Sequence, residues 1–394
     1  MVPSQRILDN LSNQAADIKP ISVDEHRLRM QKAQAIMRQS GIDALYLHGG
    51  TNLYYFTGLR WNPSERMVAA ILPAEGDPIY VAPRFELDTL KDYWLIEGEL
   101  FAWEEHQSPF QLVGEILAKM GVGVGKFAID ESTPFFIVDG LRSSVDAELI
   151  SGQPVTQACR QVKSKSEIVI IQRAHDLTLK VIQSASEILQ PGITTTEVVQ
   201  FIDDAHRAVG AVDGSYFCIV LFGVATSFPH GVKNPQVLSE NDWVLIDTGF
   251  LLHGYNSDIT RTFPFGSATD QQKRIWDLER AAQMAAFEAA QIGRPCEAID
   301  QAARGVLEAA GLGPDYQLPG LPHRTGHGCG LDIHEAPYVV RGNQTPLESG
   351  MVASIEPMIV VPGEFGVRLE DHFYMTDQGP QWFTEPARSM DEWD

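Results

Sequence analysis

Residues from about 24 to 150 alternate between helical and strand-like patterns of hydrophobic positions. Over residues 26–40, apolar side chains recur on one helical stripe, and Gly41 marks the expected end of that helix. The phrase IDALYLHGG (42–50) has the composition of a buried strand, and residues 67–84 predict two strands around a Gly-Asp-Pro turn. We therefore expect a layered α/β arrangement here. No catalytic constellation is evident in this part of the chain.

A different pattern begins near Ser164. Residues 165–189 predict a long helix that stops before Pro191, and Thr194 with Glu197 forms a capping pattern that starts a second helix. The same order of a long helix and a shorter one returns from residue 270 onward. Because strands carrying two acidic residues follow each helix pair, we expect two pseudo-symmetric halves that share one cleft.

The length of the chain supports a division into two domains. At 394 residues it exceeds a typical single domain, and its hydrophobic content of 44% is ordinary for a globular protein with a sizeable core. We place the boundary where the pattern changes, which gives an N-terminal α/β domain over 1–163 and a second domain over 164–394. The expected fold class is α/β, of the α+β kind.

Charge and composition exclude several classes of protein. With 30 basic and 52 acidic side chains, the formal net charge is −22, which repels nucleic acid phosphate. No apolar run approaches the roughly 20 residues that span a bilayer, and the N-terminus lacks the apolar core of a signal peptide. The four cysteines are widely spaced and form no CxxC pair. We expect a cytoplasmic protein without nucleic acid or membrane partners.

Five residues in the C-terminal third form the candidate chemistry. They stand in the phrases LIDTG, YNSDITRTF, RTGHGCGLDIHEAP, ASIEP and VRLED, and they are Asp247, Asp258, His327, Glu356 and Glu370. Four carboxylates and one imidazole are suitable ligands for two oxygen-preferring divalent cations. Since the residues are far apart in sequence, such a site is assembled by the fold. The pattern predicts a dinuclear metallohydrolase.

The first two acids lie in a predicted hairpin. A two-residue turn at His253 and Gly254 pairs Asp247 with Thr260 on the neighbouring strand. Asp258 then lies on the same face as Thr260, as a diagonal neighbour of Asp247. Two carboxylates in this arrangement can hold two cations, although solvated acids on the open face of a hairpin are also common.

The other three candidates lie in apolar or glycine-rich surroundings. Glu356 falls within a predicted buried strand, where an unpaired carboxylate is costly. Strand alternation places Arg368 and Glu370 on one face, so a simple ion pair is the alternative for Glu370. The glycines around His327 allow close backbone approach to its ring. Cys329 lacks an evident base, which favours a packing role over a nucleophilic one.

Further histidines accompany the five. His230, His323 and His334 are candidates for lining the cleft, whereas His253 and His372 are assigned to the surface or to positions behind the ligands. The sequence lacks the HExxH, GxSxG and phosphate-binding glycine motifs.

The phrases together resemble the metallopeptidase family that contains prolidase, aminopeptidase P and methionine aminopeptidase, which share the pita-bread fold. TNLYYFTGLRW (51–61) is similar to the N-terminal domain of the prolidase and creatinase group, and the SFPHG, DTG, SDITRTF, GHGCGLDIHE, SIEP and RLED phrases match the catalytic domain in order. The resemblance covers nearly the whole chain. It implies a creatinase/prolidase-type N-terminal domain followed by a pita-bread catalytic domain.

The resemblance implies a role for each ligand. Asp258 and Glu370 bridge two metal ions, Asp247 completes one site, and His327 and Glu356 complete the other. The ions lower the pKa of a shared water, so that hydroxide is available at neutral pH, and they polarise the scissile carbonyl. Glu356 is placed to accept the proton.

The resemblance also implies how substrate is held. His230 and His334 donate hydrogen bonds to the substrate and to the oxyanion, and His323 and Arg368 hold the carboxylate or the proline end. The separate N-terminal domain favours the Xaa-Pro group, with a dipeptide as the substrate, manganese as the metal (with cobalt, zinc or iron as alternatives) and a homodimer as the assembly.

Three other functions stay open. In the first, the enzyme acts on longer Xaa-Pro peptides, as aminopeptidase P does. In the second, it hydrolyses a non-peptide amide or amidino group, like creatinase or an ectoine-type hydrolase. Creatinase works without metal and has lost ligands, whereas all five candidates are present here. The alternative from another class is a binding module, as in chaperones that keep this fold without its activity. Those chaperones also lose the ligands.

Overall fold

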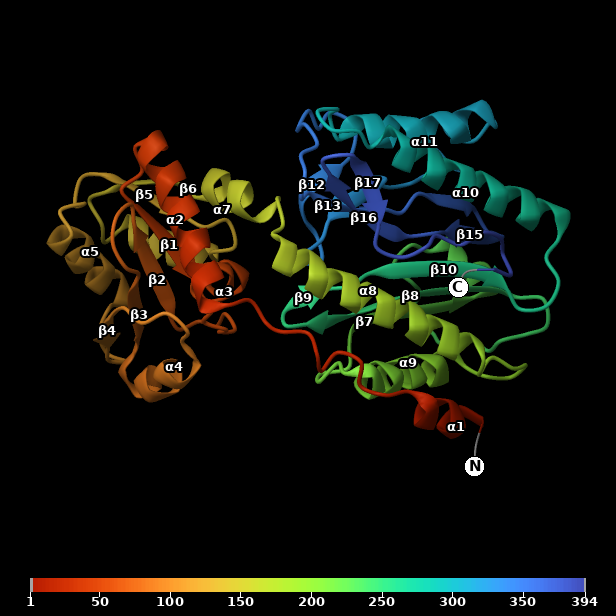
Figure 1. Ribbon diagram of the computed structural model, residues 1–394, viewed down its shortest axis with the longest axis horizontal. Coiled ribbons are helices and arrows are strands. Elements are labelled where there is room, and N and C mark those ends of the chain that lie inside the picture. Colours follow the sequence, from red (N-terminus) through yellow and green to blue (C-terminus); the bar gives the residue numbers. More distant parts are fainter. Residues whose placement is uncertain (1–2, 393–394) are drawn as a thin grey trace. The chain divides into compact units, whose positions relative to one another are not determined.

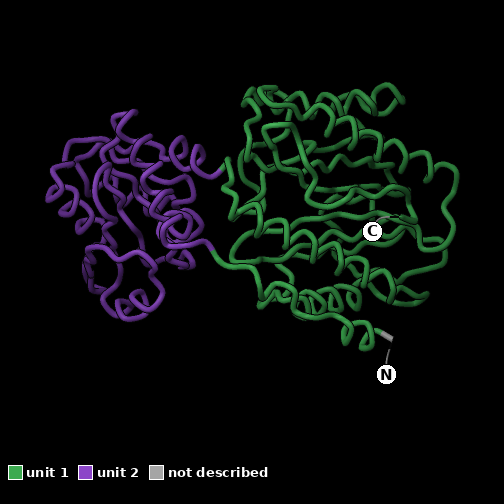
Figure 2. The backbone as a smooth tube through the Cα atoms, in the orientation of Figure 1, with its two compact units in different colours: residues 1–20, 161–394 green, residues 21–160 purple. Residues whose placement is uncertain are grey.

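The computed structural model describes residues 3–392, which form two compact units (Figure 2). Unit 1 combines the described residues before Ile21 with those from Gln161 onward, and unit 2 spans Ile21–Arg160. Residues 3–20 thus lie in unit 1, although the N-terminal domain that we predicted included them. None of the described helices combines the length and the apolar composition that crossing a bilayer requires.

Unit 2 is built on a six-stranded sheet with the strand order β4-β3-β2-β1-β5-β6. Its strands are β1 (Ala44–His48), β2 (Ala69–Pro73), β3 (Ile79–Pro83), β4 (Glu99–Trp103), β5 (Lys126–Ile129) and β6 (Glu148–Ser151). Its helices are α2 (Val23–Ser40), α3 (Thr51–Thr57), η1 (Arg84–Glu86), α4 (Leu87–Tyr93), α5 (Pro109–Lys119), α6 (Phe135–Arg142) and α7 (Gln153–Arg160). The predicted helix over 26–40 is confirmed, as are the buried strand β1 and the antiparallel pair β2/β3.

Unit 1 contains the remaining helices and strands. The helices are α1 (Pro3–Asn10), α8 (Lys165–Ser186), α9 (Thr195–Val209), η2 (Gly223–Ser227), α10 (Asp270–Ala289) and α11 (Glu297–Ala309). The strands are β7 (Ser215–Phe222), β8 (Trp243–Leu252), β9 (Tyr255–Asn256), β10 (Ile259–Pro264), β11 (Gly326–Gly328), β12 (Glu335–Val339), β13 (Val352–Ile355), β14 (Met358–Val361), β15 (Phe365–Arg368), β16 (Asp371–Thr376) and β17 (Gly379–Trp382).

The long helices of unit 1 begin at side chains that satisfy their first backbone N–H groups. Thr194 and Glu197 form a reciprocal capping box at the start of α9, which confirms the prediction. Ser164 does the same for α8 and Thr269 for α10. The helices therefore start where short-range hydrogen bonds dictate, and they end close to the glycine and proline residues noted in the sequence.

The two helix pairs lie on opposite sides of the strands of unit 1, with α8 and α9 on one side and α10 and α11 on the other (Figure 1). In the first half, β10-β8-β7 form a sheet with β9 paired to β8; in the second, β13-β16-β17 pair, as do β14-β15 and β11-β12. The expected arrangement of two halves is confirmed.

The halves meet where β10 approaches the start of β16. Thr260 and Glu370 form an isolated antiparallel bridge there. Beside it, Arg261 and Asp371 form an ion pair with an N–O distance of 2.7 Å, and both side chains are almost completely buried. This seam brings the acidic residues of the two halves together.

Candidate metal centre

The five predicted ligand residues come from separate strands and loops of unit 1 and converge at this seam. Asp247 lies within β8, Asp258 between β9 and β10, His327 in β11, Glu356 directly after β13 and Glu370 directly before β16. Glu356 keeps 13% of its side chain exposed, whereas the others are almost fully buried. Ligand atoms of His327, Glu356 and Glu370 all lie within 4.8 Å of one another.

The predicted hairpin positions the first two acids. Leu252 pairs with Tyr255 and Asp247 with Thr260, as expected. His253 and Gly254 both have positive φ, of 51° and 91°, which is the backbone of a tight two-residue turn. The strand is interrupted at Asp258, however, which lies just outside β10 and not in a continuous strand. The interruption leaves the side chain of Asp258 in contact with that of Asp247.

His327 presents one ring nitrogen to three carboxylates. Its Nδ1–H donates to the Gly328 carbonyl at 3.1 Å, so Nε2 is the ring nitrogen directed at the carboxylates. This Nε2 lies 3.1 Å from Glu356 Oε1, 3.8 Å from Asp258 Oδ2 and 3.9 Å from Glu370 Oε1. A Cβ on Gly326 would lie 2.0 Å from the Ser354 carbonyl oxygen, so the strands approach this closely because that residue is glycine.

Arg368 is the basic group among the acids. Its guanidinium forms a short ion pair with Asp247, and it also donates to Thr260 Oγ1 at 3.1 Å and to the Pro229 carbonyl at 3.1 Å. Glu370 is instead held by Thr260, whose hydroxyl donates to Oε2 at 2.9 Å. The simple ion pair considered for Glu370 therefore does not form; Arg368 pairs with Asp247.

Burial and mutual repulsion shift the pKa values of these acids. Burial is the largest cause that raises the pKa of Asp247, Asp258 and Glu370, and the neighbouring carboxylates raise all three further. Burial acts in the same direction on Glu356, but the adjoining His327 ring and its hydrogen bond, with His323 and Arg368, lower that pKa to about 2. Four carboxylates beside one guanidinium leave an excess of negative charge, which a bound cation would offset.

The carboxylate and imidazole groups of the cluster are suitable ligands for divalent cations. Asp247 Oδ1 and Glu370 Oε1 are buried without a hydrogen-bond partner among the described residues. Unpaired buried carboxylate oxygens are unfavourable unless a cation binds them. Oxygen-rich sites with imidazole accept manganese, iron, cobalt and zinc.

The structure also places the other predicted site residues. The His334 ring lies 4.0 Å from the His327 ring, and the residue as a whole keeps access to solvent. Partial burial of the ring and the charge of His327 lower its pKa to about 4. His323 donates from Nδ1 to the Arg324 carbonyl at 2.7 Å. His230 is exposed and close enough to His323 and His334 to influence their pKa values. All three lie around the acidic cluster.

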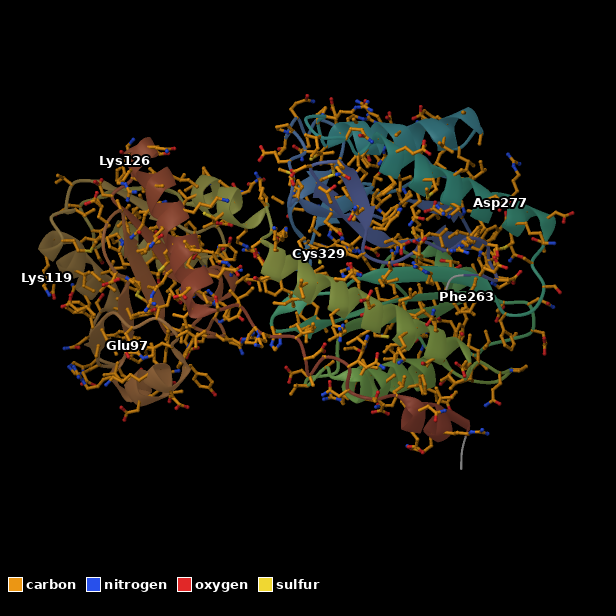
Figure 3. The ribbon with its side chains drawn as sticks, viewed as in Figure 1. Glu97, Lys119, Lys126, Phe263, Asp277 and Cys329 are labelled. Atoms are coloured by element: carbon orange, nitrogen blue, oxygen red, sulfur yellow. The ribbon has the colours of Figure 1, made fainter. Side chains whose placement is uncertain are left out.

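Two further residues lie near the cluster. Cys329, labelled in Figure 3, is fully buried, and its Sγ donates weakly to the Asn256 carbonyl at 3.7 Å, consistent with a packing role. His372 is also fully buried, and its ring nitrogen belongs with Asp258 and Glu370 in a second group of possible ligands. Strand alternation in the phrase LEDHF was the available signal, because it places residues 370 and 372 on one face.

Comparison with known proteins shows the family. Residues 169–377 match metallopeptidase family M24, and residues 29–162 match the creatinase/prolidase N-terminal domain. The chain therefore belongs to metallopeptidase family M24, and the resemblance to its prolidase group, the pita-bread fold and the peptidase class are confirmed.

Individual relatives are similar to this chain over most of their length. A putative dipeptidase from Bacillus subtilis, YkvY, is 32% identical over 365 residues, which are 92% of this chain and 99% of the relative. The structure of the dipeptidase PepE from Mycobacterium ulcerans has a TM-score of 0.86 and 32% identity, covering 93% of this chain and 97% of that one. A prolidase from Thermococcus sibiricus has a TM-score of 0.85 and 29% identity, covering 94% and 99%.

Proposed function

We propose that this metallopeptidase is an Xaa-Pro dipeptidase with a dinuclear metal centre. The observation that carries the proposal is the convergence of Asp258, His327, Glu356 and Glu370 at one buried point, next to Asp247. The excess of negative charge and the unpartnered carboxylate oxygens support two cations in preference to a purely structural ion-pair network.

In this proposal the two carboxylates nearest the seam, Asp258 and Glu370, would contribute to holding both ions. Asp247 would complete one site, and His327 with Glu356 would complete the other. When bound, two divalent ions lower the pKa of a water molecule and polarise a carbonyl group. Asp247 is paired with Arg368, so binding an ion through its free Oδ1 leaves that ion pair in place.

Glu356 is proposed as the acceptor of the proton that the attacking water loses. It is the most exposed carboxylate of the five residues, with 13% of its side chain exposed, and it adjoins His327. An ionised carboxylate next to the substrate can take up a proton and deliver it to the leaving amine.

The surrounding histidines are proposed to contact the substrate. His334 and His230 are exposed and donate hydrogen bonds to the substrate and to the oxyanion. His323 and Arg368 hold the proline end. Because Arg368 already donates to Asp247, Thr260 and the Pro229 carbonyl, it acts through its positive charge and its fixed position beside the candidate ligands.

The choice of Xaa-Pro dipeptides rests on the N-terminal domain and on relatives named as dipeptidases and prolidases. Manganese is the ion that we propose for the cell, since metal availability decides among several ions that suit such ligands. The homodimer and the cytoplasmic location stay predictions.

Product analysis tests the proposal directly. The manganese-loaded protein is incubated with Ala-Pro, Ala-Pro-Ala, Met-Ala-Ser and creatine, and the products are identified by mass spectrometry. Cleavage of Ala-Pro alone is the expected result. Cleavage of Ala-Pro-Ala assigns the enzyme to the aminopeptidase P type, and consumption of creatine alone overturns the peptidase proposal. A parallel preparation of Asp258→Ala controls for contaminating peptidases.

A further inference from the structure

His372 is a fully buried histidine that the proposed reaction does not use. It lies in β16, two residues after Glu370, and pairs with Ser354 of β13. The His175 ring from α8 lies 4.8 Å from its ring on one side, and the His327 ring lies 5.8 Å away on another. The imidazole is therefore held between α8 and the acidic cluster.

The hydrogen bond of His372 determines which nitrogen is free. Its Nδ1 lies 2.9 Å from the Asp258 carbonyl oxygen, which only accepts hydrogen bonds, so Nδ1 carries the proton. In the neutral ring Nε2 then bears a lone pair. This Nε2 is buried and has no hydrogen-bond partner among residues 3–392.

The His372 ring lies in a compact group of possible ligands. One of its ring nitrogens and carboxylate oxygens of Asp258 and Glu370 all lie within 4.8 Å of one another. The Glu370 Oε1 atom is likewise buried without a hydrogen-bond partner in the described chain. Lone pairs that face one another in a protein interior are unfavourable unless a positive charge lies between them.

We propose that His372 is an additional metal ligand, which binds through Nε2 on the Asp258 and Glu370 side of the centre. Its Nδ1–H bond to the Asp258 carbonyl orients the ring, in the way that hydrogen bonds commonly fix ligand histidines. The centre then has imidazole donors from both His327 and His372. A second imidazole favours cobalt, zinc or iron on ligand grounds, so manganese in the cell would rest on metal availability.

Cobalt(II) substitution tests this assignment without measuring activity. In the full-length cobalt-loaded protein, the ring N–H of a ligand histidine gives a strongly shifted, exchangeable proton NMR signal. We compare the wild type with His372→Phe and His372→Gln, and measure cobalt affinity by competition with a chelator. His175→Phe is the matched control, because His175 is equally buried, bonds one backbone carbonyl and packs against His372 with its ring centroid 4.8 Å away.

The expected result is the loss of one shifted N–H signal in both His372 variants and a decrease in cobalt affinity of about tenfold or more. His175→Phe keeps the signal and the affinity. If a folded His372 variant keeps the wild-type signals and cobalt affinity, the proposal is overturned. In the wild type, His372 would then share a proton with a carboxylate and would not bind metal.

Should neither variant fold, the wild type still decides. With ¹⁵N-labelled histidine, loading with zinc moves the Nε2 resonance of each ligand histidine to the metal-bound position while its Nδ1 stays protonated. Only one histidine with this pattern overturns the proposal.

Discussion

Asp258 interacts with several members of the acidic cluster. Its carboxylate faces His327 and lies near Asp247, and its backbone carbonyl accepts a hydrogen bond from the His372 ring. We predict that Asp258→Ala loses both bound metal and peptidase activity, because the shared ligand is removed. Metal per chain is measured by mass spectrometry. Glu364→Ala, an exposed acid in the turn before β15, is the control, and two ions per chain in Asp258→Ala would contradict the bridging role.

Glu356 is predicted to act mainly on turnover. Replacement by glutamine keeps the shape of the side chain but removes its ability to accept a proton. We expect kcat for Ala-Pro to decrease by roughly 100-fold or more while KM changes little, the range known for general acid-base groups. Steady-state kinetics at matched metal content measure both. Unchanged kcat would exclude the proton-accepting role.

The helix caps are predicted to affect the stability of the protein and not its catalytic activity. Thr194 accepts from the Glu197 N–H at 3.2 Å, and Glu197 accepts from the Thr194 N–H at 2.8 Å. We predict that Thr194→Ala lowers the free energy of unfolding by about 1 kcal/mol, as measured by urea denaturation. Thr194→Ser retains the cap and most of the stability, and kcat is unchanged in both variants.

The ion pair between β10 and β16 is predicted to contribute more to the free energy of unfolding than the helix cap does. Arg261 also donates to the Glu370 carbonyl at 2.9 Å, and Gln283 donates to the second oxygen of Asp371 at 2.9 Å. Arg261→Met leaves the Asp371 charge buried without its partner, and we predict a loss of about 3–5 kcal/mol in the free energy of unfolding.

The double variant Arg261→Met/Asp371→Leu separates the two causes of that loss. Since it removes both charges, urea denaturation of the double variant should show recovery of much of the stability. If the double variant is as unstable as the single one, packing and not the uncompensated charge is responsible.

The chain as a whole is divided into two compact units, each with its own hydrophobic core. Because the candidate ligands all lie in unit 1, a bound metal stabilises that unit by mass action. We predict two calorimetric transitions, of which only one rises in temperature when manganese is added. An equal rise of both transitions would mean that the units unfold together.

Much of the fold could be predicted because its causes are short-range. The capping box at Thr194 and the turn at His253–Gly254 involve residues within four positions of each other, and the turn sets the pairing of Asp247 with Thr260. The residue types of the candidate site could also be predicted, since an acidic side chain in an apolar strand is unfavourable without a partner. The family comparison confirmed the fold and the peptidase class that these phrases predicted.

The amino-acid sequence by itself thus predicted the long helices, the hairpin register and the residue types of the candidate site. Only the tertiary structure decided that Arg368 pairs with Asp247, that His372 faces Asp258 and Glu370, and that residues 3–20 lie in unit 1. The physical reason is distance along the chain. Local hydrogen bonds and side-chain alternation act over a few residues, whereas contacts between residues more than a hundred positions apart depend on how the packed halves fit together.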